Sequence, residues 1–127
     1  INMILTMYKR RAKENGISVK ISAKASGSLA VPPQDLVIVI ANLFENAINA
    51  TAKLSGKGRN IDIQIKDSPE RLLIKIDNPC RANLSFDETL YGIGIRSVIA
   101  TTTKYEGMYD FTAEDGVFSA KIILNLR

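Results

Sequence analysis

The chain has 127 residues, of which 46% are hydrophobic and 24% are charged. These values are ordinary for one globular domain that buries roughly two thirds of its unfolded surface. No apolar run approaches the roughly 18 residues that a membrane-spanning helix needs, and no signal peptide opens the chain. Cys80 is the single cysteine, so no internal disulfide forms and a reducing compartment is the simplest interpretation.

The net charge of +4 comes partly from a basic cluster near the start of the chain, at Lys9, Arg10, Arg11 and Lys13. A nucleic-acid surface normally interleaves such charges with aromatic side chains. That interleaving is missing here, so we expect a solvated helix end and no nucleic-acid partner.

The first predicted element is a helix over residues 2–15, ended by the helix-stopping pair Asn15-Gly16. The chain opens as if in the middle of a helix, so we expect it to be a piece of a longer protein. On this interpretation residues 1–16 are the remnant of a preceding helical segment, and residues 17–127 form the domain.

The remaining elements follow from hydrophobic periodicity and turn residues. In chain order, the pattern predicts a strand at 17–22, a loop at 24–33, a long helix at 34–54, strands at 61–66 and 71–77, a long loop at 79–91, a helix at 95–104, and strands at 108–112 and 117–126. Adjacent hairpins with about three helices predict an α+β fold. We expect a two-layer α/β sandwich, in which helices cover one face of a mixed, largely antiparallel sheet of about five strands.

The long helix carries the most informative pattern in the chain. Four polar residues share one face, opposite an apolar face, and they are Asn42, Glu45, Asn46 and Asn49. Asparagine is a weak helix former, so three of them within eight residues indicate that amide groups are wanted as metal ligands or hydrogen-bond partners. An ordinary solvated face is an equally good interpretation of this helix alone.

Two further patterns are weaker. Gly92-Ile93-Gly94 precedes a predicted helix, and the unpaired N–H groups at the start of that helix suit phosphate. Arg96 lies one turn into the helix and could reach the same anion. The alternative interpretation of the two glycines is a tight turn without a ligand. Asp77 ends a strand, where its carboxylate can accept a hydrogen bond from an amino group such as that of adenine. Taken alone, Asp77-Asn78-Pro79 is better explained as a turn.

The order of these motifs resembles the Bergerat-fold ATPases, the GHKL group. Asn42 to Ala50 looks like the N box, Ile76-Asp77-Asn78 like the first glycine box, and Gly92-Ile93-Gly94-Ile95 like the second. The resemblance covers about residues 17–126. Among the branches, the chain looks most like the catalytic domain of a sensor histidine kinase, with quorum-sensing peptide receptors the closest group.

The resemblance implies ATP and Mg²⁺ as cofactors. It implies that Asn46 coordinates Mg²⁺, that Asp77 binds the adenine amino group, and that Gly92 and Gly94 border the phosphates and a lid at 79–91. The ATP-binding residues that it implies are Asn42, Asn46, Asn49, Asp77, Asn78, Gly92, Ile93, Gly94, Ile95 and Arg96.

The departures from the family pattern are also informative. ATP-hydrolysing branches carry a water-activating glutamate where this chain has Asn42, which has no carboxylate to accept a proton. Glu45 is best interpreted as a solvated carboxylate, so Asn42 and Glu45 are only weak catalytic candidates. Asn49 replaces a lysine common in better-known histidine kinases, and Pro79 replaces a glycine.

The resulting prediction is transfer of the γ-phosphoryl group of Mg-ATP to a histidine. The chain contains no histidine, so the acceptor is expected on a separate dimerisation domain of the full-length protein, with a response regulator as an indirect partner. We expect a cytoplasmic domain of a membrane-anchored bacterial receptor, in contact with the membrane only through missing segments. The alternatives are an anti-sigma-factor-type serine kinase and a degenerate GHKL interaction domain that no longer binds nucleotide.

Overall fold

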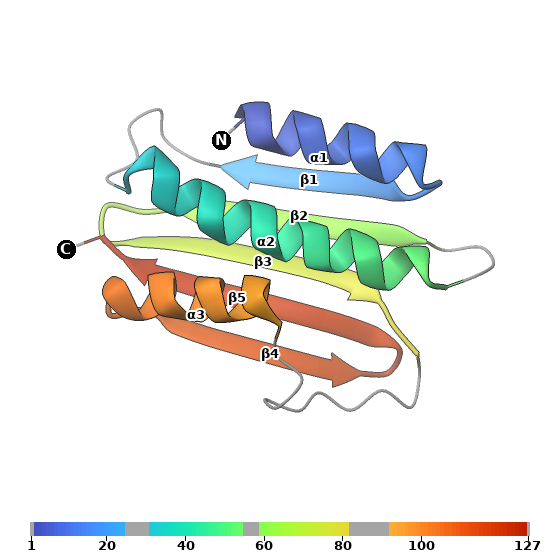
Figure 1. Ribbon diagram of the computed structural model, residues 1–127. Coiled ribbons are helices and arrows are strands. Elements are labelled where there is room, and N and C mark those ends of the chain that lie inside the picture. Colours follow the sequence, from blue (N-terminus) through green and yellow to red (C-terminus); the bar gives the residue numbers. More distant parts are fainter. Residues whose placement is uncertain (1, 25–30, 55–58, 82–91, 127) are drawn as a thin grey trace.

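The computed structural model describes residues 2–24, 31–54, 59–81 and 92–126, and these ranges contain three helices and a five-stranded sheet. The elements in chain order are α1 (Asn2–Glu14), β1 (Ser18–Lys24), α2 (Pro33–Ala52), β2 (Asn60–Asp67), β3 (Arg71–Pro79), α3 (Ile93–Lys104), β4 (Met108–Glu114) and β5 (Val117–Asn125). All three helices lie over one face of the sheet (Figure 1). The predicted α+β class and the two-layer sandwich are confirmed.

The sheet is mixed, with the strand order β1-β2-β3-β5-β4. β1 is parallel to β2, and the other neighbouring strands are antiparallel. The parallel pair is connected through α2, as parallel strands require. The β4–β5 hairpin closes at Asp115 and Gly116, whose φ values of 52° and 78° suit the two-residue turn that matches strand twist. The predicted hairpin at this position is confirmed.

The core lies between the sheet and the helices. On the three central strands every second side chain is buried, because successive side chains point to opposite faces of a sheet. Full burial of each such Ile or Leu stabilises the fold by roughly 1.5–3 kcal/mol relative to exposure. The residues on this helix-facing side include Ile61, Ile63, Ile65, Leu72, Ile74, Ile76, Ile122 and Leu124.

Helix α1 contributes to the same core. Leu5, Tyr8 and Ala12 are buried, and the Tyr8 ring stacks on Phe44 of α2 with centroids 5.3 Å apart. α1 thus packs into the same core as the other helices, and the expectation that residues 1–16 are the remnant of a preceding helical segment stays a prediction. Where the domain begins in a longer protein stays a prediction.

The predicted end of α1 at Asn15-Gly16 is confirmed. Gly16 has a φ of 72°, and the Ile17 N–H donates to the Ala12 carbonyl at 3.0 Å. This bond and the left-handed glycine form a common C-terminal cap.

Most element ends differ from the prediction by one or two residues, and two of these differences bear on the site. β3 continues past Asp77 because Asn78 and Pro79 still pair with β5. α3 begins at Ile93 instead of Ile95. Residues 25–30 of the predicted loop at 24–33, residues 55–58, and residues 82–91 of the predicted lid at 79–91 lie outside the described residues. Among the described helices, none has the length and apolarity to cross a membrane.

Candidate functional site

The predicted polar face of α2 lies beside the buried face of the helix, at its boundary with solvent. Asn42, Glu45 and Asn46 are half-buried and Asn49 is exposed, whereas the apolar face is fully buried. Asn42 and Asn46 are four residues apart and therefore neighbours on one stripe of the helix. In the described ranges the Asn46 side chain makes no hydrogen bond, so its amide oxygen is available to a ligand.

Asn42 joins α2 to the start of α3. Its Nδ2 donates to the Ile38 carbonyl at 2.7 Å, which fixes the amide. Its Oδ1 lies so close to Gly94 that a Cβ built there would be 3.0 Å away. The two motifs are thus in contact, although they are far apart in the sequence.

Gly94 is needed for this contact and not for its backbone conformation, which lies within the helix. The atom nearest to a Cβ added at Gly94 would be Asn42 Oδ1, so this missing Cβ leaves room for a side chain of the domain itself. At Gly92 an added Cβ would meet nothing within 4 Å. The two glycines of the motif therefore have different surroundings.

No side chain of the described residues caps the N-terminus of α3. Gly92, the N-cap residue, is extended with φ −80° and ψ 178° and offers no side-chain hydrogen bond. The N–H groups of the first turn have no carbonyl partner within the helix, and they carry its positive dipole end. This is a suitable anion site. The Ile95 side chain is buried and that of Ile93 is exposed, so these residues offer only their backbone; Arg96 is exposed one turn in.

The other end of α3 is fixed to α2 by polar contacts. Asp35, in the first turn of α2, accepts hydrogen bonds from the Tyr105 hydroxyl and from Lys104 Nζ, the latter at 3.0 Å. The hydrogen bond from Tyr105, followed by that from Lys104, lowers the pKa of Asp35. Burial, together with the nearby Asp35 carboxylate, raises the pKa of Tyr105 to about 12.

Asp77 does not share the side of the sheet with Asn46 and Gly94, contrary to the prediction that these residues converge. It pairs with Ser119 on β5, whose hydroxyl donates to Asp77 Oδ1, and Lys75 Nζ lies 3.6 Å from Asp77 Oδ2. These residues alternate with the buried, helix-facing ones, so they lie on the open face of the sheet. The expected convergence is wrong because β3 continues beyond Asp77.

Asn78 occupies the helix-facing position instead. It follows Ile74 and Ile76 in the alternation and is only 2% exposed. Its Nδ2 donates to the Pro79 carbonyl at 2.9 Å, which leaves Oδ1 as the acceptor. The alternation of buried and exposed side chains, followed along β3 as far as Pro79, is the sequence signal that places Asn78 toward the helices and Asp77 on the open face.

A cavity of about 460 Å³ lies next to this strand end. This size is typical of small-molecule pockets. Burial raises the pKa of the Cys80 thiol, so the thiol stays protonated. Sequence reasoning missed this cavity, whose lining comes from the end of α2 and the segment after β3: Ala50, Lys53, Leu54, Cys80 and Arg81.

Glu45 is turned toward α1. Its carboxylate lies 3.5 Å from Arg11, and its side chain is 44% exposed. α1 and α3 lie on opposite sides of α2 (Figure 1). Glu45 therefore points away from the contact between Asn42 and Gly94, and its half-buried carboxylate pairs with α1 instead of being simply solvated.

The residues around Asn46 suit a cation that is shared with a ligand. Across the described ranges, no three His, Cys, Asp or Glu side chains gather as a metal site. Mg²⁺ is commonly held by one or two protein oxygens together with substrate phosphates and water. The free amide oxygen of Asn46, near an uncapped helix start, fits such an arrangement.

Comparisons with known proteins agree with this geometry. A family model described as a GHKL domain matches residues 31–125. A probable C4-dicarboxylate sensor kinase of Bacillus subtilis (strain 168) is 33% identical over 89 residues, which are 67% of this chain and 17% of that protein. The chain thus spans about a sixth of the length of this relative.

Solved structures share the fold. The histidine kinase AdeS of Acinetobacter baumannii matches with a TM-score of 0.78 and 15% identity, over 99% of this chain and 62% of that chain. The nucleotide-free catalytic domain of the histidine kinase ThkA matches with a TM-score of 0.76 and 14% identity, over 98% of this chain and 89% of that chain.

The fold is therefore the one seen in catalytic domains of histidine kinases. The chain belongs to the GHKL domain family. Membership of this family implies use of ATP.

Proposed function

We propose that this domain binds Mg-ATP and donates the γ-phosphoryl group to a histidine on a separate dimerisation domain. The observation that carries the proposal is the contact between Asn42 and Gly94. It brings the asparagine stripe of α2 beside the uncapped start of α3.

Each end of the nucleotide has its own partners in this proposal. The N–H groups at the start of α3 and the Arg96 guanidinium bind phosphate oxygens. The base enters the cavity between Ala50, Lys53 and Cys80. Asn78 Oδ1 accepts a hydrogen bond from the adenine amino group, taking the role first assigned to Asp77.

Asn46 would hold Mg²⁺ through its amide oxygen, and the ion would neutralise charge that develops on the phosphates. The contribution of this chain is positioning and electrostatic stabilisation. Asn42 cannot act as a general base because it has no carboxylate and its amide is tied to Ile38. The amide of Asn42, in place of the glutamate of the ATP-hydrolysing branches, favours transfer to a protein acceptor over hydrolysis.

The partners follow from the composition and from the relatives. The sequence contains no histidine, so the acceptor belongs to another domain. A relative named as a sensor kinase supports a response regulator as the next acceptor and a membrane-anchored receptor as the full-length protein. On this proposal the domain itself lies in the cytoplasm.

Calorimetry with ATP and Mg²⁺ tests the proposal. We expect saturable binding that weakens strongly when Mg²⁺ is chelated. Absence of heat at millimolar ATP would favour a GHKL interaction domain that has lost nucleotide binding. Phosphohistidine is expected only when an acceptor domain is added. Phosphoserine on a regulatory partner would instead favour the serine-kinase alternative.

A further inference from the structure

The basic cluster near the start of the chain divides into two parts. Arg11 turns toward α2, where it lies 3.5 Å from Glu45 and 6.0 Å from the centre of the Tyr8 ring. Lys9, Arg10 and Lys13 are exposed on another side of α1 and have no ion-pair partner within the described ranges. Three unpaired cations therefore remain that the nucleotide site does not use.

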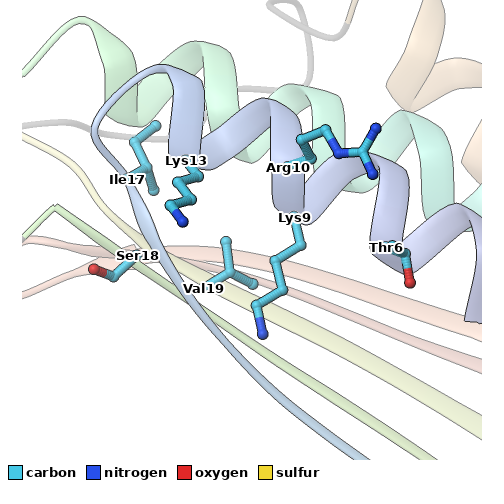
Figure 2. A pocket seen from close by; sticks show the side chains of 7 residues that line it. All are labelled: Thr6, Lys9, Arg10, Lys13, Ile17, Ser18 and Val19. Carbon is cyan, nitrogen blue, oxygen red and sulfur yellow. The ribbon is translucent and has the colours of Figure 1, made fainter.

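These three cations line a groove of about 520 Å³ between α1 and β1. Figure 2 shows Lys9 and Lys13 extending from α1 toward β1, beside Val19. Ile17 is buried in the groove and Val19 is half-buried, so the floor is partly apolar. The groove combines an apolar floor with a positive wall.

The groove runs along the edge of the sheet. β1 is the first strand in the order and pairs with β2 alone among the described strands. An edge strand presents unpaired N–H and C=O groups that accept another strand. Lys20 and Lys24 on the open face of β1 add positive charge next to this edge.

We propose that the groove between α1 and β1 binds an extended acidic segment of a partner protein, which adds a strand to the edge of β1. Side chains of an added strand alternate between two faces. Carboxylates on one face lie near Lys9 and Lys13, and carboxylates on the other face lie near Lys20 and Lys24. Apolar positions between them cover Val19 and Ile17.

The charge and shape of the groove favour a polypeptide over other anions. A nucleic-acid strand normally stacks its bases on aromatic side chains, and the groove lining has none. A lipid surface contacts exposed tips and does not use a strand edge. A peptide uses both the cations and the unpaired backbone.

The experiment measures binding of a fluorescent peptide of repeating Glu-Glu-Val-Glu, matched in length to β1, to the 127-residue chain. As a strand this peptide presents Glu on both faces and Val between the Glu side chains of one face. We expect saturable binding that weakens at least about fivefold in a Lys9→Glu/Lys13→Glu variant. The matched control, Arg71→Glu/Lys121→Glu, carries the same charge change away from the groove and is expected to change affinity less than about twofold. Raising NaCl from about 50 to about 500 mM should weaken binding.

Two further probes test the mode of binding. A peptide with Pro in place of each Val keeps the charge but cannot form a ladder, and it should bind at least about fivefold more weakly. Equal binding of the Pro peptide, or equal binding to the Lys9→Glu/Lys13→Glu variant, would overturn the proposal. So would binding of phosphatidylserine vesicles that depends on Lys9 and Lys13 while the Glu-Glu-Val-Glu peptide fails to bind. Unchanged ATP binding by each variant shows that the domain remains folded.

Discussion

At its C-terminal end α3 is tied to α2 by the buried Asp35 carboxylate, which accepts hydrogen bonds from Tyr105 and Lys104. At its N-terminal end the same helix meets α2 through Asn42 and the missing Cβ of Gly94, and its first N–H groups have no cap. The polar groups are thus satisfied at one end and available at the other. One end stabilises the helix pair, and the other offers binding groups to a ligand.

The largest effect is expected for Asn46→Ala at the open end. Loss of the amide oxygen removes the protein ligand proposed for Mg²⁺, so Mg-ATP affinity should fall about 100-fold, on the order of 2.7 kcal/mol. Calorimetry measures this directly. Gln34→Ala is the matched control, since Gln34 also carries an amide and is exposed on the same helix, away from the proposed site. Equal losses in the two variants would contradict a specific role for Asn46.

The second largest effect is expected for Asn78→Ala, in comparison with a variant of its neighbour Asp77. Asn78→Ala removes a buried acceptor and should weaken ATP binding about tenfold. Asp77→Asn lies on the open face of the sheet and should change affinity less than about twofold. Titration of both variants with a fluorescent ATP analogue checks this order. A larger loss of affinity for Asp77→Asn than for Asn78→Ala would restore the first assignment, in which Asp77 binds the adenine amino group.

A smaller effect is expected for Gly94→Ala. Alanine favours a helix by up to about 1 kcal/mol over glycine, but its Cβ would lie 3.0 Å from Asn42 Oδ1 and would press α3 away from α2. Affinity for ATP should fall a few-fold without a large loss of thermal stability. Gly92→Ala is the control because its Cβ meets open space, and a larger loss there would contradict this account.

At the C-terminal end of α3, Tyr105→Phe should lower the thermal stability of the domain more than its affinity for ATP. It removes one hydrogen bond to Asp35, and we expect the melting temperature to fall by about 5 °C. The ATP affinity of the folded variant should stay within about twofold of the parent. Calorimetry and thermal unfolding on one preparation make the comparison. A tenfold loss of affinity would show that the two ends of α3 are not independent.

The smallest effects concern pH. The pKa of Tyr105 is raised to about 12 in the folded state. The Tyr105 hydroxyl therefore contributes fully to the free energy of unfolding below its unfolded-state pKa near 10, and this contribution is lost as the pH rises toward 12. The parent should lose stability more steeply than Tyr105→Phe over this range. The pKa of Asp35 is lowered, so its contribution is lost in acid, below about pH 4. Parallel unfolding curves for parent and Tyr105→Phe above pH 10 would contradict the first expectation.

Most of the fold was predictable because it depends on local patterns. The alternation of Ile61, Ile63 and Ile65 indicates a half-buried strand, and Asp115-Gly116 specifies a two-residue turn. Residues 2–15 were predicted as a helix, but their part in the core was not. That role depends on the stacking of Tyr8 on Phe44, which no periodicity reveals.

The site was predictable only in part. The asparagine stripe and the glycine motif could be found, because each is contiguous in the sequence. Their contact through Asn42 and Gly94 depends on how two helices pack, which neither motif encodes. The role of Asp77 was implied by the resemblance, which does not fix the strand register. Pairing with β5 extends β3 to Pro79, and the alternation places Asp77 on the open face and Asn78 toward the helices.

The single parallel pairing in the sheet also has a kinetic consequence. β1 pairs with β2 across the whole of α2, so closing this pair costs more loop entropy than closing either hairpin. We expect α1 and β1 to join late during folding and to detach first during partial unfolding. The layer formed by α2, α3 and the hairpins would then persist as the more slowly exchanging part of the domain.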